Sequence, residues 1–250
     1  MTTLVTIPFS HYCEKARWAL DYARVDYREE GHVPGFHRIA TRRAGGRNTV
    51  PVLVLDDGSA LDDSPLIVRW ADERAGAERK LLPPEGPGRD EALALERRFD
   101  RDLGPHVRRF GYFHVLPDRA LTLRLMDAST PRAERVGLRA LFPVLRRFMR
   151  RHMRIDEAGA VASRDRYRAV FDEVAARLKD GRPYLMGDRF GAADITFAAL
   201  AAPLLGPAEV PFPLPPVEAL PAALGREIDE LRAHPAGALA LRVYRTHRTR

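Results

Sequence analysis

The stretch near the N-terminus that decides the fold is an apolar run followed at once by an amphipathic segment. Residues 4–9 are Leu-Val-Thr-Ile-Pro-Phe, and residues 10–17 are Ser-His-Tyr-Cys-Glu-Lys-Ala-Arg. The first four residues of the run predict a strand, and the apolar positions of residues 12–23 recur with helical spacing. The first N–H groups of such a helix are unpaired and carry partial positive charge. This end therefore favours a thiolate, either that of Cys13 or that of a bound thiol.

The overall composition indicates an ordinary globular protein. The chain has 250 residues, of which 45% are hydrophobic and 30% charged, so it can bury the core of one large domain or of two modest ones. No apolar stretch approaches the roughly 18 residues that would span a bilayer, and the N-terminus does not resemble a signal peptide. The single cysteine excludes an internal disulfide. We therefore expect a cytoplasmic protein.

Residues 131–154 alone carry a net charge of +7, equal to that of the whole chain. That segment has one acid, Glu134, and the arginines 132, 135, 139, 146, 147, 150, 151 and 154. Its apolar residues recur at steps of three and four, which predicts a helix that Pro143 should kink or divide. We expect a core helix with a solvated arginine face, the alternatives being a face for an anionic substrate, a membrane surface or nucleic acid. No aromatic residues interleave the charges as in single-strand binding sites, so no nucleic acid is expected.

The chain divides into two regions with different patterns of apolar residues, joined by a linker. Residues 1–76 predict an α/β unit, and residues 77–88 are a linker rich in proline and glycine. Strands are expected at 4–7, 25–27, 50–55 and 60–62, and helices at 12–23 and from 63–65 onward. Residues 89–250 lack any two-residue period and predict an all-helical domain. Its expected helices are 89–115, 119–128, 131–153, 163–180, 192–205 and 222–233, with a proline-rich loop at 206–216.

Three motifs each allow a functional and a structural interpretation. Pro51 opens a strand without a donor N–H; a cis bond after Val50 would present the Val50 backbone to an extended ligand, and a trans bond would not. Asp63 and Ser64 start a helix, where they could bind an amino-acid head group or only cap the helix. Cys13 is either a functional thiol or a small buried side chain.

Asp194 is expected to be structural. With Gly191 as the N-cap, Asp194 stands at the third helical position and its carboxylate can accept the Gly191 N–H. Phe190 and Ile195 then occupy the positions of a hydrophobic staple. No cluster of His and Cys has the spacing of metal ligands, so no metal is expected.

Together these segments resemble the cytosolic glutathione S-transferase superfamily, of a serine type found in bacteria. The resemblance is carried, in the family's order, by residues 10–17, 50–53, 63–67 and 187–195. It implies a thioredoxin-like α/β domain followed by an all-helical bundle, and it implies a homodimer.

The resemblance also implies a site for glutathione as co-substrate. Ser10 would stand beside the glutathione sulfur, and the Val50 backbone, preceding a cis Pro51, would pair with the cysteinyl unit. Asp63 and Ser64 would bind the γ-glutamyl end. Thr49 stands where a lysine often precedes the Val-Pro pair, so Arg47 is the nearest cation for the glycine end.

The function that follows is a transferase in which Ser10 activates the glutathione thiolate for attack on a small electrophile. By position, the electrophile pocket is expected to include Tyr12, Phe99, Phe110 and Tyr112. One alternative is a Cys13-dependent thiol oxidoreductase, because Ser-His-Tyr-Cys resembles the glutaredoxin motif Cys-Pro-Tyr-Cys. Another is a non-catalytic relative that binds a protein or an anionic surface through residues 131–154.

Overall fold

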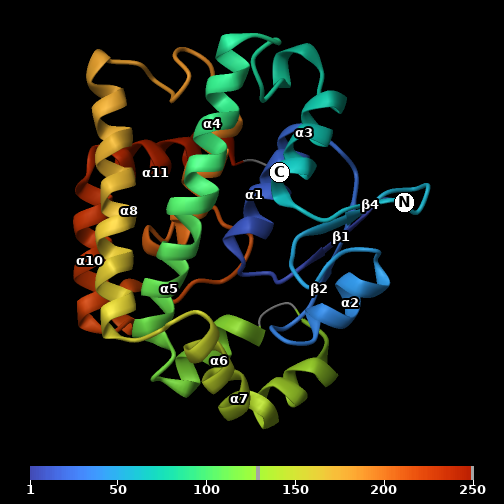
Figure 1. Cartoon of the computed structure of the whole chain (residues 1–250), viewed down its shortest axis with the longest axis vertical. Coiled ribbons are helices and arrows are strands. Elements are labelled where there is room, and N and C mark those ends of the chain that lie inside the picture. The colour runs from blue at the N-terminus through green and yellow to red at the C-terminus, as the bar shows by residue number, and fades with distance from the viewer. Residues whose placement is uncertain (128–129, 249–250) are drawn as a thin grey trace.

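The computed structural model describes residues 1–127 and 130–248. Figure 1 shows a small α/β domain, which contains the N-terminus, beside a larger helical domain. The architecture is that of a thioredoxin-like domain followed by an all-helical one, as the sequence predicts.

Within the described residues the sheet has four strands in the order β2-β1-β3-β4. They are β1 (Thr3–Thr6), β2 (Arg28–Gly31), β3 (Val52–Val54) and β4 (Ala60–Leu61). β1 is parallel to β2 and antiparallel to β3, and β3 is antiparallel to β4. Leu4 and Leu53 face each other in this register and are fully buried. Because parallel strands need a crossover, helix α1 (His11–Tyr22) begins where β1 ends.

The second strand differs from the expected one at 25–27. That segment completes the turn after α1, since the Val25 N–H donates to the Leu20 carbonyl at 3.0 Å. β2 instead uses residues 28–31, Arg-Glu-Glu-Gly, which lie at the edge of the sheet. An edge strand needs few apolar residues, so the hydrophobic pattern gave no signal for it. The other helices of this domain are α2 (His37–Arg43) and α3 (Ser64–Arg74).

The second domain consists of helices joined by short turns. The helices are α4 (Pro87–Asp102), α5 (Gly104–Val115), α6 (Arg119–Asp127), α7 (Arg132–His152), α8 (Glu157–Arg177), α9 (Ala192–Ala201), α10 (Ala222–Ala233) and α11 (Pro235–His247). Single 3₁₀ turns occupy Ala77–Arg79, Leu178–Asp180, Ala202–Leu204 and Val217–Ala219.

These helices differ from the sequence prediction in three places. The single helix expected at 89–115 is two, because Pro105 lacks the N–H that would continue the ladder through Gly104. Helix α8 begins six residues earlier than expected, and its N-cap Asp156 accepts the Gly159 N–H at 2.7 Å. Helix α11 was not predicted. Residue 128, the expected end of another helix, lies outside the described residues.

Helix α9 is the centre of the helical core. Every one of its residues is buried, so it packs on several neighbours, including α1 and α4. Asp194 accepts N–H groups from Leu185 at 2.9 Å and from Gly191 at 3.0 Å, which holds the preceding loop against the helix. Burial raises the pKa of Asp194 to about 6, although these two hydrogen bonds oppose the shift.

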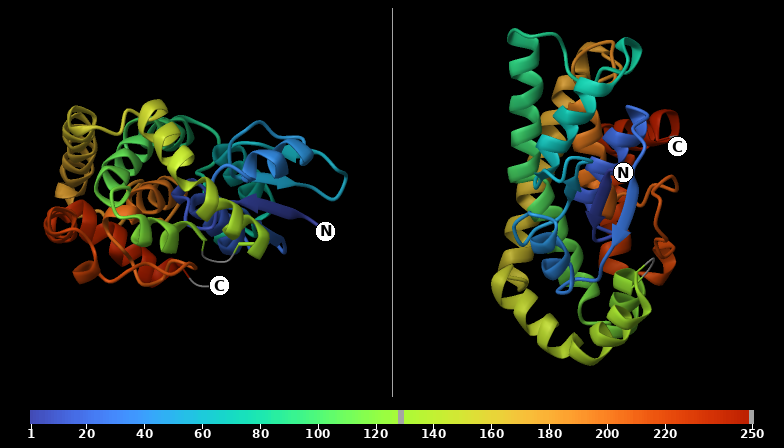
Figure 2. Two further views of the ribbon diagram at one scale, coloured as in Figure 1. Left: turned by 90° about the horizontal axis from the view of Figure 1, so that it is seen from below. Right: turned by 90° about the vertical axis from the view of Figure 1, so that its right-hand side faces the viewer.

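Helix α7 matches the expected core helix with a solvated arginine face only in part. It remains one helix with Pro143 inside it, and Figure 2 shows it as an arc at the edge of the molecule. Only Leu138, Phe142 and Met149 of its residues are buried. Among the described residues, no helix is both long and apolar enough to span a membrane.

Candidate functional site

Ser10 is held at the junction of β1 and α1. Its N–H donates to the Ile7 carbonyl at 2.9 Å, and its carbonyl accepts the Glu14 N–H at 2.9 Å. Its hydroxyl makes no capping bond to the helix backbone. Ser10 is partly exposed and lines a large cavity, so its hydroxyl can meet a ligand at the positive end of α1.

Cys13 lies one turn further along α1 and is fully buried. Burial raises the pKa of its thiol to about 11, although the Arg17 charge and hydrogen bonds with the Ile7 backbone and Ser10 side chain oppose the shift. The thiol therefore stays protonated at neutral pH. Cys13 is not among the described residues that line either cavity at this site.

A cavity of about 520 Å³ gathers the other residues expected to bind glutathione. The Val50–Pro51 bond is cis, which decides between the two alternatives left by the sequence. The cavity is lined by Tyr12, Arg47, Asn48, Thr49, Val50, Pro51, Asp62, Asp63, Ser64 and Arg108. Four separate segments of the sequence thus meet around one volume.

Asp63 and Ser64 form one end of this cavity. Asp63 is the N-cap of α3 in an extended conformation, and its side chain makes no capping hydrogen bond. Ser64 is 1% exposed, and its hydroxyl has no hydrogen-bond partner among the described residues. A buried hydroxyl normally has a partner, so this unmatched group fits a site that a polar ligand completes.

Arg47 lies at the rim. Its Nε donates to Asp62 at 2.7 Å, and its side chain is 79% exposed. The hydrogen bond from Arg47 lowers the pKa of Asp62, so that carboxylate offsets part of the arginine charge.

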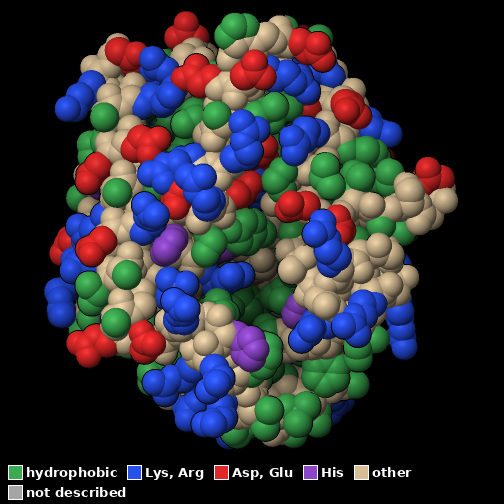
Figure 3. All heavy atoms as spheres, viewed as in Figure 1, with side chains coloured by type: hydrophobic (Ala, Val, Ile, Leu, Met, Phe, Trp, Pro, Cys, Tyr) green, Lys and Arg blue, Asp and Glu red, His purple; other side chains and the backbone are tan. Residues whose placement is uncertain are grey.

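The larger cavity, of about 1220 Å³, adjoins the smaller one. Tyr12, Asn48, Thr49, Val50 and Arg108 line both cavities. Its remaining walls include the N-terminal end of α1, parts of α2, α5, α6, α7 and α10, and the proline-rich loop 206–216. Figure 3 shows a hollow between the two domains with hydrophobic side chains at its base and Lys, Arg and His side chains around it.

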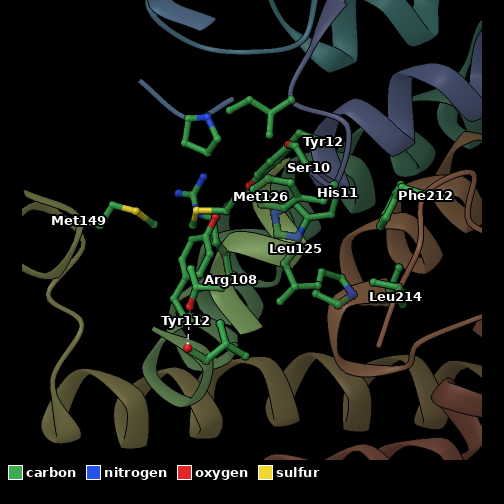
Figure 4. A pocket seen from close by; sticks show the side chains of 18 of the residues that line it. Ser10, His11, Tyr12, Arg108, Tyr112, Leu125, Met126, Met149, Phe212 and Leu214 are labelled. Atoms are coloured by element: carbon green, nitrogen blue, oxygen red, sulfur yellow. Dashed lines mark hydrogen bonds between the residues drawn. The ribbon is translucent and has the colours of Figure 1, made fainter. Parts of the chain in front are cut away.

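Two of the four aromatic residues expected in an electrophile pocket line this cavity. They are Tyr12 and Tyr112, both drawn in Figure 4. The Tyr12 hydroxyl donates to the Asp100 carbonyl at 2.8 Å, which fixes its ring. Phe99 and Phe110 are buried in the helical core instead, where Phe99 packs on Phe197 and Phe110 on Tyr167.

His11 and Arg108 line the cavity without having been expected from the sequence. His11 is 4% exposed, and its Nε2 has no partner among the described residues. Burial, helped by the nearby Arg108 charge, lowers the pKa of His11 to about 3, so the imidazole is neutral. Arg108 projects from α5, which is remote from α1 in sequence, and only the packing of the two domains brings them together.

Comparison with known proteins agrees with this geometry. Family models of the glutathione S-transferase N-terminal and C-terminal domains match residues 4–79 and 157–225. No curated protein sequence matches significantly. In the described part of the chain, no group of three or more His, Cys, Asp or Glu could hold a metal ion.

Solved structures show the same fold at low sequence identity. A glutathione S-transferase from Xanthobacter autotrophicus Py2 is 20% identical, with a TM-score of 0.61 over 97% of this chain and 91% of that one. A glutathione S-transferase from Sinorhizobium meliloti 1021 is 20% identical, with a TM-score of 0.59 over 100% and 94%. Gtt2 from Saccharomyces cerevisiae is also 20% identical, with a TM-score of 0.55 over 96% and 100%.

Proposed function

This chain belongs to the glutathione S-transferase superfamily, and we propose that it joins glutathione, through its sulfur, to an electrophile. The smaller cavity would hold glutathione and the larger one the electrophile. The observation that carries the proposal is the meeting of the two cavities at Tyr12 and Val50, next to Ser10. A thiol bound in the smaller cavity can thus reach the larger one.

Each part of glutathione has a candidate partner. The unmatched Ser64 hydroxyl and the N-terminus of α3 would bind the γ-glutamyl carboxylate, and the Asp63 carboxylate would bind its ammonium group. The Val50 backbone would pair with the cysteinyl unit. Arg47, at the rim, would bind the glycine carboxylate while it stays paired with Asp62.

Ser10 would favour the thiolate form of the bound thiol. A free thiol has a pKa of about 8.5 and is mostly protonated at neutral pH. A hydroxyl that donates to the sulfur, together with the helix terminus, stabilises the thiolate. A stabilisation of about 1.4 kcal/mol lowers the pKa by roughly one unit. The thiol proton leaves to solvent, sulfur supplies the electron pair of the new S–C bond, and the leaving group departs with the pair of the bond that breaks.

The Cys13 alternative lacks support from the geometry. An oxidoreductase needs an accessible thiolate, whereas Cys13 is fully buried and its pKa is raised to about 11. The other alternative is a non-catalytic protein that binds an anionic surface through α7, whose arginines are exposed except at Arg135 and Arg146, which are half-buried. A homodimer in the cytoplasm, as expected of the family, remains part of the leading proposal.

Calorimetric titration with reduced glutathione tests the proposal. The wild type should bind in the micromolar to millimolar range, and Ser64→Ala should bind about tenfold more weakly because it loses a hydrogen bond to a charged group. Ser59→Ala, an exposed serine outside both cavities, is the matched control and should bind like the wild type. Absence of binding to the wild type would refute the transferase and favour the role of α7 in binding an anionic surface.

A further inference from the structure

We infer that the larger cavity takes an amphipathic acid, with an apolar body under α7 and an anionic group at Arg108. The inference rests on the proposed function, because it assigns the chemical class of the second substrate. It depends on three features of the cavity: its size and apolar rim, the sign of the charges that line it, and the availability of the Arg108 guanidinium for a ligand.

The cavity is built for a large apolar body. Its volume of about 1220 Å³ exceeds the roughly 300–1000 Å³ of most small-molecule sites. Large apolar side chains at its rim are open to solvent: Ile39 is 53% exposed, Leu141 54%, Val144 69% and Phe148 45%. An apolar surface of this kind around a cavity marks a place where an apolar ligand enters.

The charges in the cavity are of one sign. Among the described lining residues there is no Asp or Glu, whereas Arg38, Arg108 and Arg232 are present. Burial lowers the pKa of His37 as well as that of His11, so the lining histidines add no charge at neutral pH. Apolar walls weaken solvent screening, so cations in such a cavity favour an anionic ligand over a neutral one.

Arg108 is the arginine available to receive the anion. Arg232 already donates to the Leu205 carbonyl at 2.7 Å and to the Gly206 carbonyl at 3.2 Å. Arg38 lies at the outer edge on α2, beside the exposed Ile39. Arg108 makes no hydrogen bond or ion pair with any residue in the ranges that the structure describes. A free guanidinium can bind a carboxylate through two parallel hydrogen bonds.

The position of Arg108 associates it with the larger cavity. It lines both cavities, and its charge acts on Tyr12, which also lines both, and on His11 and Tyr112, which line the larger one alone. Figure 4 shows Arg108 among Tyr112, Leu125 and Met126, on the side that Ser10 and Tyr12 approach. An anion held there would place its apolar body against α7 and its reactive part near Ser10.

The test compares an acid with a neutral analogue of the same chain length. Binding of oleate and of oleyl alcohol, each below its aggregation concentration, is measured by displacement of a fluorescent apolar probe without glutathione. The wild type should bind oleate about tenfold more tightly than the alcohol, as one charge-assisted pair allows. Arg108→Gln should lose this preference and keep its affinity for the alcohol. Arg97→Gln, an exposed arginine on α4 outside both cavities, should behave as the wild type.

Two results would overturn the inference. One is equal binding of acid and alcohol by the wild type. The other is an Arg108→Gln variant that keeps the preference for oleate but binds glutathione more weakly, which would place Arg108 in the glutathione site. The binding of oleate and oleyl alcohol is measured without glutathione. A negative result there is therefore distinguishable from failure of the transferase proposal.

Discussion

Helices α1 and α7 each carry charged and apolar sides, but the fold uses them in opposite ways. On α1, Glu14, Lys15 and Arg17 are at most 1% exposed, and each is paired. Lys15 contacts Asp100 at 2.8 Å, and Glu14 lies between Arg17 and Arg248, at 2.7 Å from each. On α7 most of the arginines face solvent, and much of the apolar side faces a cavity.

This difference separates a fixed part of the site from an adaptable one. The buried ion pairs hold α1, and with it Ser10, in one position between the two domains. Helix α7 is attached at two points. Near its start, Glu134 accepts the Val33 N–H at 3.0 Å and contacts His32 at 2.7 Å. Just beyond its end, the Met153 carbonyl accepts a hydrogen bond from Arg109 at 2.7 Å. Substitutions on α1 should therefore affect folding, and substitutions on α7 the choice of ligand.

The largest effect is expected for Glu14→Gln. This change removes the negative charge between two buried guanidinium groups and should lower the free energy of unfolding by about 3 to 5 kcal/mol. Chemical denaturation measures it, with Glu78→Gln as the control at an exposed position. Equal stability of the two variants would show that α1 is not held by its buried charges.

Next in size is the low reactivity of Cys13. Its pKa of about 11, against 9.0 for an unperturbed thiol, makes the thiolate about a hundredfold rarer in the folded protein at pH 7.5. Iodoacetamide should modify the native protein at least that much more slowly than the unfolded chain. Similar rates of modification in the folded and unfolded protein would mean that this turn of α1 opens readily. That result would support the Cys13-dependent oxidoreductase instead.

A smaller loss of stability is expected for Gly104→Ala at the start of α5. A Cβ atom there would lie 2.3 Å from the Tyr12 hydroxyl oxygen, so Tyr12 or the helix must move. The free energy of unfolding should fall by about 1 to 3 kcal/mol. Gly111→Ala, on the same helix with open space around it, should instead be neutral or stabilising by up to about 1 kcal/mol. If both variants have the same stability, Gly104 does not lie as close to Tyr12 as this distance implies.

The smallest change in stability is expected on α7, for Val144→Ser. Val144 is 69% exposed, so the free energy of unfolding should change by less than about 0.5 kcal/mol. Binding of oleyl alcohol should weaken about threefold through lost apolar contact. Val161→Ser, at an exposed valine of α8 outside the cavity, should leave binding unchanged. A large loss of stability in Val144→Ser would make α7 part of the core after all.

Much of the α/β domain could be predicted because its signals are local. The run before Ser10, the cap at Asp63 and the apolar strand after Pro51 each follow from neighbouring residues. Edge strand β2 could not be predicted, because its sequence has no apolar period and its position depends on pairing with β1.

The candidate site divides in the same way. Arg47, Val50, Pro51, Asp63 and Ser64 were expected from the sequence, and they line one cavity, while their roles toward glutathione stay predictions. Arg108 was missed because nothing local distinguishes it from the other arginines of the chain. Its importance arises when the fold brings the start of α5 next to the start of α1, where Gly104 lies against Tyr12. Helix α7 was expected in the core because the period of its apolar residues does not show whether its apolar side packs on another element or faces a cavity.

The most direct test of the account is the pKa of the glutathione thiol when bound, measured from its thiolate absorbance near 240 nm as the pH is raised. In the wild type this pKa should lie at least about one unit below the value of about 8.5 for a free thiol. In Ser10→Ala, measured at saturating glutathione, it should return most of the way toward 8.5. The same lowered pKa in both proteins would show that the Ser10 hydroxyl does not stabilise the thiolate, and would contradict the proposed role of the α1 N-terminus.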